Sequence, residues 1–159
     1  MYKVLFLCSG NICRSPLAEG IFRKLLTDKG LDSRIEVSSA GTHGMHAGEA
    51  PDPRTIKTAE KHGYSLGGIT AEQIDPLKLR DYKLVVCMDS SHYQFVMERC
   101  HPDDESRVKL FLHYHTTTEL DDVPDPYYGE EDGFEEVFEL IEQGCRQFLE
   151  TIESQVLAT

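Results

Sequence analysis

The sequence predicts an α/β protein, and two observations support this class. Short apolar segments alternate with longer amphipathic segments along the chain, as in strands joined by crossover helices. The apolar segments lack the polar alternation of a half-exposed strand, as expected when helices cover both faces of a parallel sheet. With 159 residues and no linker or repeat, we expect a single small doubly wound domain over residues 1–159, with a four-stranded parallel sheet.

The first part of the chain contains two predicted strands separated by a helix. Residues 3–7 form a short apolar segment, which we interpret as a buried strand. Residues 17–26 repeat apolar side chains at helical spacing, and Gly30 then ends the helix. A second short strand is expected over residues 34–38. The segment 41–53 is rich in glycine, proline and histidine, and a loop of this length usually has a function.

The second part continues the alternation. Residues 54–62 predict a helix that ends at Gly63, and residues 83–88 form a third, entirely buried strand. A helix over residues 90–100 and a fourth strand over residues 107–112 follow. In such a sheet, ligands bind beyond the carboxyl ends of the strands.

The last part consists of a loop and a helix. Residues 116–131 form an acidic loop that contains two prolines, and residues 134–152 show the clearest helical periodicity in the chain. The final helix therefore completes the cover of the predicted sheet.

The composition restricts the partners of the protein. The chain has 28 acidic and 16 basic residues and a formal charge of −12, so we expect no nucleic-acid partner. No apolar segment is long enough to cross a bilayer and no signal-peptide profile is present, so we expect no membrane association. Five cysteines without disulfide-framework spacing predict free thiols in a reducing cytoplasm. We expect a monomer or a weak dimer.

A cysteine and an arginine enclose the loop after the first strand. Small residues between Cys8 and Arg14 allow successive amides to point at one centre, and a helix start at Ser15-Pro16 adds further unpaired amides. Arg14 supplies donors that match phosphate oxygens. A helix N-terminus and a cation favour a thiolate, which makes Cys8 a candidate nucleophile. The residues predicted to bind phosphate are Ser9, Gly10, Asn11, Ile12, Cys13, Arg14 and Ser15.

The residues alone leave simpler interpretations open. Cys8 and Arg14 could be a buried structural cysteine and a surface arginine, although the flanking strand and helix start argue against this. Cys13 lacks the partners of a metal site, so we expect no metal. The segment 125–128, Asp-Pro-Tyr-Tyr, could present a carboxylate rigidly beside two aromatic rings. On composition alone, however, it more simply indicates a solvated acidic turn.

The segment 4–16 resembles the signature of the low-molecular-weight protein tyrosine phosphatases, Cys-x-Gly-Asn-Ile-Cys-Arg-Ser-Pro. The resemblance extends over nearly the whole chain. It implies a doubly wound fold and the hydrolysis of phosphotyrosine in proteins through a phosphocysteine on Cys8, with no metal and no organic cofactor. The further matching segments are 38–42, 51–54, 88–89 and 123–129.

The resemblance also implies roles for residues inside and outside the loop. Asp125 is the general acid that protonates the leaving phenolate and then the base that activates water. Tyr127 and Tyr128 form one wall of an aromatic slot. Cys13 can form a disulfide with the nucleophile and protect it from further oxidation. The residues that support the loop are Asn11, Ser15 and Ser39.

Two positions depart from the family pattern, and three other functions remain as alternatives. Many relatives have an aromatic residue in place of Met45, which forms the opposite wall of the slot, and an arginine in place of Glu72. Arsenate reductases and protein-arginine phosphatases of this fold have similar loops, but Ile12 and Pro16 argue against the former and Ile12 against the latter. A non-catalytic phosphotyrosine-binding module is the third alternative. It would not need the nucleophile, arginine and acid together.

Overall fold

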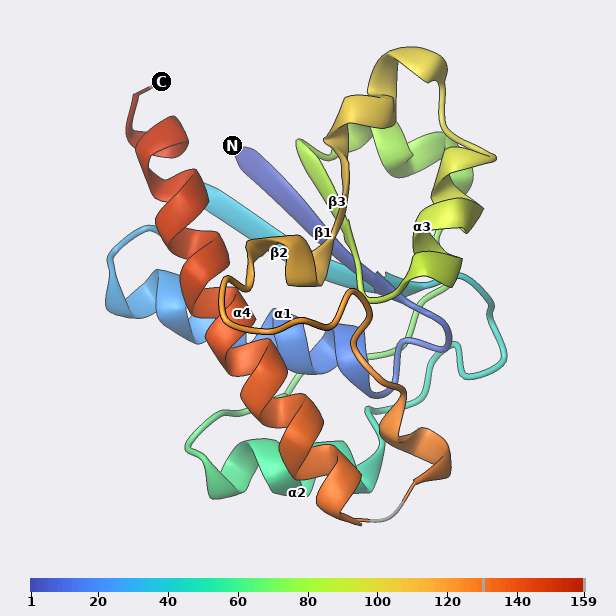
Figure 1. The fold of residues 1–159 in the computed structure, drawn as a ribbon, viewed down its shortest axis with the longest axis vertical. Coiled ribbons are helices and arrows are strands. Elements are labelled where there is room, and N and C mark those ends of the chain that lie inside the picture. The colour runs from blue at the N-terminus through green and yellow to red at the C-terminus, as the bar shows by residue number, and fades with distance from the viewer. Residues whose placement is uncertain (130, 159) are drawn as a thin grey trace.

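The computed structural model describes residues 1–129 and 131–158 and confirms the α/β class (Figure 1). Four parallel strands form one sheet in the order β2-β1-β3-β4. The register places Cys8 beside Gly41 and Leu7 beside Cys87, so three strands end at the same edge of the sheet. The strands are β1 (Tyr2–Cys8), β2 (Ile35–Gly41), β3 (Leu84–Cys87) and β4 (Val108–Leu110).

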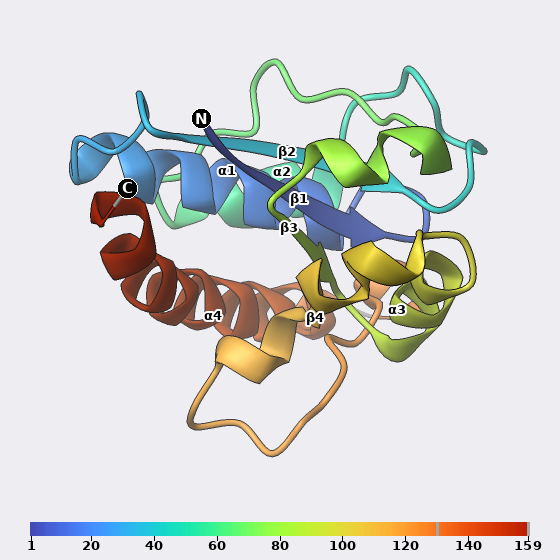
Figure 2. The same cartoon turned by 90° about the horizontal axis from the view of Figure 1, so that it is seen from above.

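Helices cover both faces of this sheet, as predicted. The helix α4 packs along α1 on one face, with α2 beside it, whereas α3 lies on the other side of the strands (Figures 1 and 2). Within the described residues the helices are α1 (Arg14–Asp28), α2 (Pro53–Lys61), α3 (Ser90–Met97) and α4 (Glu131–Leu157), and the 3-10 helices are η1 (Pro76–Asp81), η2 (Pro102–Arg107), η3 (Phe111–Tyr114) and η4 (Pro126–Tyr128).

Aromatic side chains pack the helices α1 and α4 against the central strand β1. The ring of Phe6 on β1 meets Phe22 of α1 edge-on at 5.7 Å and Phe148 of α4 at 5.9 Å, measured between ring centroids. Phe6, Phe22 and Phe148 are fully buried. Such pairs each contribute about 0.5–1.5 kcal/mol beyond their buried area. These contacts fix the position of β1, the strand that leads to the loop between Cys8 and Arg14.

The boundaries differ from the predictions where short 3-10 turns interrupt the apolar pattern. The predicted strand over residues 107–112 ends at Leu110 because the chain turns into η3 at Phe111. The 3-10 helix η1 was not predicted, since six residues that begin with a proline are too short to show a helical period. No helix in the described ranges, 1–129 and 131–158, is long and apolar enough to span a bilayer.

Candidate active site

A cavity of about 410 Å³ opens at the carboxyl edge of the sheet, where the loop after β1 meets the acidic loop before α4. The structure brings the predicted nucleophile, arginine, acid and slot residues together here. Gly41 is required at the base of this edge, because a Cβ there would lie 2.6 Å from the Ser9 carbonyl oxygen. The cavity is lined by Cys8, Ser9, Gly10, Ile12, Cys13, Arg14, His43, Met45, His46, Asp125, Tyr127 and Tyr128.

Asn11 holds the loop in its curled shape. Its φ of 60° is left-handed, a conformation that asparagine tolerates better than most residues. The amide nitrogen Nδ2 donates to Ser15 Oγ at 2.8 Å and to Ser39 Oγ at 3.0 Å. Its Oδ1 accepts from the backbone N–H of Glu72 at 2.9 Å. The three predicted supporting residues therefore form one buried network, whereas Glu72 contributes its backbone and has an exposed side chain.

A buried carboxylate extends this network in a way that sequence reasoning missed. Ser39 Oγ donates to Glu19 Oε1 at 2.6 Å, and Glu19 also pairs with Arg23 one helical turn later. Glu19 is only 7 % exposed. The available signal was a charged residue within the apolar run at the start of α1, because such a residue needs a partner when it is buried.

The sulfur of Cys8 lies beside a serine hydroxyl at the open end of α1. Cys8 Sγ is 2.9 Å from Ser15 Oγ. Ser15 Oγ accepts from Asn11, and its own hydrogen can go to the Cys8 sulfur or to the more distant Ala40 carbonyl at 3.4 Å. The start of α1 has no side-chain cap among the described residues, whereas aspartates cap α2 and α3. The first-turn amides of α1 are thus free to bind an anion together with the loop amides.

Arg14 is buried, and its partners orient it. Its Nη1 donates to Asp89 Oδ2 at 2.6 Å and to the Val123 carbonyl at 3.0 Å. Among the described residues, its Nη2 has only long contacts, 3.5 Å to Ser9 Oγ and 3.5 Å to Asp125 Oδ2. A buried guanidinium needs a fixed counter-ion, and Asp89 provides it. One side of the fork is therefore held in place while Nη2 faces the cavity.

Asp89 remains ionised because its partners outweigh its burial. Burial raises the pKa of this carboxyl, but hydrogen bonds from Ser91 and Arg14 lower it to about 2. Asp89 also caps α3, and its backbone N–H donates to His92 Nδ1 at 3.1 Å. Asp89 lies in the matching segment 88–89, where the sequence alone gives it no role. Its role depends on a contact between residues 75 positions apart.

His92 is 1 % exposed and stays neutral in the folded protein. Burial and the nearby Arg14 lower its pKa from 6.5 to about 4. The negative charges of Asp89, Asp125 and Asp122 act in the opposite direction. Its Nε2 lies 2.8 Å from Ser9 Oγ. His92 therefore links the cap of α3 to the phosphate-binding loop.

The neutral state of His92 leads to a prediction for pH. The free energy of unfolding is expected to decrease by up to about 3 kcal/mol between pH 6.5 and pH 4, because the unfolded chain takes up the histidine proton first. Urea unfolding at a series of pH values measures this slope. The variant His92→Asn should lose most of it, and an unchanged slope in that variant would contradict the assignment.

The acidic loop is anchored on both sides of Asp125. Val123 donates its N–H to the Met88 carbonyl at 2.9 Å and accepts from Arg14 through its own carbonyl. Asp125 Oδ1 accepts from the Tyr127 N–H at 3.0 Å, which starts η4 and leaves Oδ2 facing Arg14. The tertiary contacts thus hold the Asp125 carboxylate beside the loop between β1 and α1.

Arg54 connects the acidic loop to the rest of the site. Its guanidinium makes a bidentate pair with Asp52 at 2.9 and 3.1 Å, donates to the Tyr127 carbonyl at 3.1 Å and lies over the Phe134 ring at 4.6 Å. Asp52 in turn donates its N–H to the Ile12 carbonyl at 2.8 Å. Arg54 therefore joins the two loops, a role that its place in the matching segment 51–54 did not reveal.

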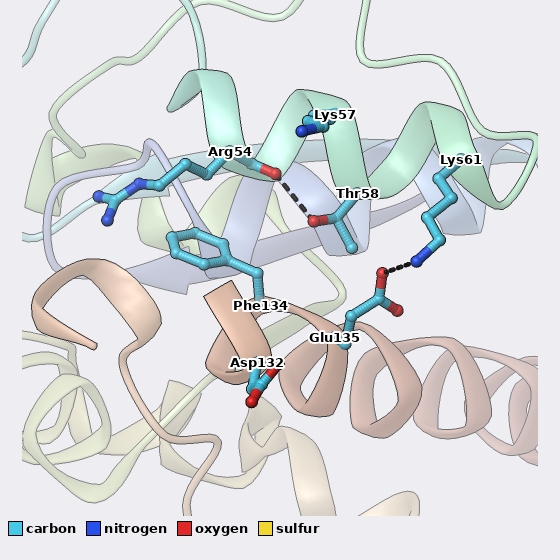
Figure 3. Close-up of a pocket in the computed structure, with 7 residues that line it drawn as sticks. All are labelled: Arg54, Lys57, Thr58, Lys61, Asp132, Phe134 and Glu135. Atoms are coloured by element: carbon cyan, nitrogen blue, oxygen red, sulfur yellow. Dashed lines mark hydrogen bonds and ion pairs between the residues drawn. The ribbon is translucent and has the colours of Figure 1, made fainter. Parts of the chain in front are cut away.

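A second hollow of about 220 Å³ is lined by Arg54 and by further residues of α2 and of the start of α4 (Figure 3). In Figure 3 the guanidinium of Arg54 extends beyond the Phe134 ring, and Lys61 reaches across to Glu135 at 2.9 Å. Arg54 and Lys61 each have a carboxylate partner, whereas Lys57, which also lines the hollow, has no ion pair within the described residues. We interpret this hollow as part of the support of the acidic loop.

Aromatic and imidazole rings surround the mouth of the cavity. Tyr127 is 37 % exposed and Tyr128 is 89 % exposed, while Met45 opposite is 80 % exposed. Two residues without a predicted role, His43 and His46, also line it. A Cβ at Gly10 would lie 3.0 Å from His46 Cδ2 and 3.2 Å from His43 Cε1, so this glycine allows both rings to cover the loop.

Comparisons with known proteins identify the family of the chain. A family model described as low molecular weight phosphotyrosine protein phosphatase matches residues 3–158. The low molecular weight protein-tyrosine-phosphatase YfkJ of Bacillus subtilis is 40 % identical over 155 residues, which cover 98 % of each chain. The low molecular weight phosphotyrosine protein phosphatase of Homo sapiens is 36 % identical over 150 residues, which cover 93 % of this chain and 94 % of the relative.

Solved structures give the same result. The crystal structure of YfkJ from Bacillus subtilis superimposes with a TM-score of 0.92 over 98 % of this chain and 96 % of that chain, at 40 % identity. The crystal structure of a protein tyrosine phosphatase from Entamoeba histolytica, with Hepes in its active site, superimposes with a TM-score of 0.93 at 30 % identity. The match covers 98 % of this chain and 99 % of that chain. The chain described here belongs to the low molecular weight phosphotyrosine protein phosphatase family.

Proposed function

We propose that Cys8, Arg14 and Asp125 carry out phosphomonoester hydrolysis in this protein-tyrosine phosphatase, whose substrates are phosphotyrosine-containing proteins. The observation that carries the proposal is the shared cavity at the open end of α1, which holds the thiol, the guanidinium and the carboxylate. An anion nest beside a buried thiol suits attack on phosphorus. The exposed rings at the mouth suit a flat aromatic leaving group.

The first step transfers the phosphoryl group to sulfur. The Cys8 thiolate attacks phosphorus while the bond to the tyrosine oxygen breaks, and Asp125 gives its proton to that oxygen. The loop amides and Arg14 Nη2 bind the three equatorial oxygens, where negative charge is spread in the transition state. Contacts that strengthen in the transition state lower the barrier.

The second step returns the enzyme to its starting state. Asp125, now a carboxylate, takes a proton from a water molecule as that water attacks phosphorus. The phosphorus–sulfur bond breaks and the electron pair returns to Cys8, whose sulfur can accept a hydrogen bond from Ser15. Inorganic phosphate leaves, and no step in this sequence calls for a metal or an organic cofactor.

The choice between phosphotyrosine and the alternative substrates can be tested directly. We expect kcat/KM for a phosphotyrosyl peptide to exceed that for the matching phosphoarginyl and phosphoseryl peptides by about 100-fold, because only the tyrosine ring fills the slot between Tyr127, Tyr128 and Met45. Release of inorganic phosphate measures all three rates. Equal rates on phosphoarginine, or turnover of arsenate with a thiol reductant, would favour the other enzymes of this fold.

We propose the same reducing setting that the sequence suggests. All five cysteines are free thiols in the structure, which supports a cytoplasmic setting. In this proposal the protein is a single domain that works as a monomer or a weak dimer. Burial raises the pKa of Cys13 to about 12, so Cys13 stays protonated while Cys8 reacts. Its place in the same cavity wall supports a protective disulfide with Cys8 after oxidation.

A further inference from the structure

We infer that the Ser9 side-chain hydroxyl is an additional hydrogen-bond donor to the bound phosphoryl group, and that His92 holds it in the donating orientation. The inference rests on the proposed function, because it concerns the same anion site. It assigns to Ser9 a contact beyond that of its backbone amide. It also gives His92, which no motif of the loop includes, a positioning role.

The tautomer of His92 follows from its two neighbours. Nδ1 lies 3.1 Å from the backbone N–H of Asp89, and a backbone amide can only donate. The Asp89 carboxylate oxygen Oδ1 is farther from Nδ1, at 3.4 Å, and already accepts from Ser91 and from the His92 N–H. Nδ1 must therefore be the unprotonated, accepting nitrogen. Since the ring is neutral when it is folded, its single N–H lies on Nε2. That N–H donates to Ser9 Oγ at 2.8 Å.

The orientation of the Ser9 hydroxyl follows from this tautomer. Its oxygen accepts from His92 and, at 3.5 Å, from Arg14 Nη2. Both neighbours are donors, so the hydroxyl hydrogen must point away from them. Within residues 1–129 and 131–158, the Ser9 hydroxyl has no hydrogen-bond partner besides His92 Nε2 and Arg14 Nη2. No group of the protein therefore accepts the hydroxyl hydrogen. Ser9 is half-buried and lines the cavity with Cys8, so the hydrogen is available to an anion bound there.

The arrangement places two donors of different kinds on one side of the anion. Arg14 Nη2 and the Ser9 hydroxyl lie 3.5 Å apart, so they would meet the same or adjacent nonbridging oxygens of the phosphoryl group. Their hydrogens do not compete, because His92 occupies the accepting side of the hydroxyl. A preset donor needs no reorientation when charge develops in the transition state.

The test compares variants that remove the donor with variants that keep it. Ser9→Ala removes the hydroxyl, and Ser9→Thr is the matched control that retains it. His92→Asn removes the contact with Ser9, because the shorter asparagine side chain cannot reach that hydroxyl. The asparagine can still accept from the Asp89 amide. The measurements are the Kd of inorganic phosphate by calorimetry and kcat/KM with para-nitrophenyl phosphate, with thermal unfolding to establish that each variant folds.

We expect Ser9→Ala to raise the Kd of phosphate and to lower kcat/KM by about tenfold each, the usual effect of one hydrogen bond to a charged group. Ser9→Thr, which keeps the hydroxyl, should recover most of the phosphate affinity and of the kcat/KM that Ser9→Ala loses. The double variant Ser9→Ala/His92→Asn should be no worse than Ser9→Ala, because His92 acts only through the hydroxyl. Nitrogen NMR should detect the His92 proton on Nε2.

Three outcomes would overturn the inference: unchanged phosphate affinity in Ser9→Ala, additive losses in the double variant, or a His92 proton on Nδ1. These outcomes are distinct from failure of the proposed function. In that case the wild-type protein itself would not hydrolyse the aryl phosphate, whereas phosphate binding by the wild type and its Ser9 variants would still report on the hydroxyl.

Discussion

Replacement of Cys8 by serine is expected to abolish hydrolysis of para-nitrophenyl phosphate, with kcat reduced by at least about 10⁴-fold. The reason is that a serine hydroxyl is far less acidic than a thiol, and the amides and Ser15 that surround this position cannot ionise it. Binding of inorganic phosphate should survive, because the loop amides and Arg14 are unchanged. Stopped-assay kinetics and calorimetry measure the two properties separately.

A second cysteine provides the control for Cys8. Cys100 is half-buried outside the cavity, so Cys100→Ser should retain full activity. Rapid quench of the wild-type reaction should also trap a phosphoryl group on the peptide that contains Cys8. Substantial activity in Cys8→Ser, or a phosphoryl group trapped on another residue, would show that the nucleophile has been assigned wrongly.

Replacement of Asp125 by asparagine should slow the hydrolysis of phosphotyrosine and phenyl phosphate by about 10²–10⁴-fold, the usual contribution of a general acid. Asparagine keeps the acceptor for the Tyr127 N–H, so η4 should keep its shape. Substrates with strongly acidic nitrophenols should be affected much less, because their leaving oxygen needs little protonation. A plot of rate against leaving-group acidity should therefore become steeper.

The matched control for Asp125 comes from the same loop. Asp121 is exposed and outside the cavity, so Asp121→Asn should leave both classes of substrate unaffected. The comparison separates a loss of acid catalysis from a general change in loop charge. Equal losses on activated and unactivated substrates in Asp125→Asn would rule out the role of Asp125 as the acid.

The fold could be predicted because its signal is local. Buried strands and amphipathic helices appear as apolar patterns over five to fifteen residues, and the alternation of the two nearly dictates a parallel sheet. The loop at residues 8–16 was also readable, since nucleophile, turn residues and helix start are contiguous. Patterns of this kind missed the 3-10 turns, for example at η3, because three to six residues show no period.

The contacts among distant segments could not be predicted in the same way. Arg14 is paired with Asp89 and Val123, and Ser9 with His92, across 75 or more positions of the chain. In the sequence, each of these residues looks like an ordinary helix cap or loop residue, so its neighbours along the chain do not reveal its distant partner. Only the packing of α3 and the acidic loop against the end of β1 turns them into parts of one site.

The sequence by itself determined the fold class and predicted a nucleophile and an anion nest, because these predictions depend on neighbours along one strand, loop and helix. The tertiary structure decided which donors of Arg14 are held and which one faces the cavity, where Asp125 is fastened, and how His92 orients the Ser9 hydroxyl. The physical reason is that buried charges and hydroxyls take their orientation from the partners that satisfy them. In this fold those partners come from loops that meet only at the edge of the folded sheet.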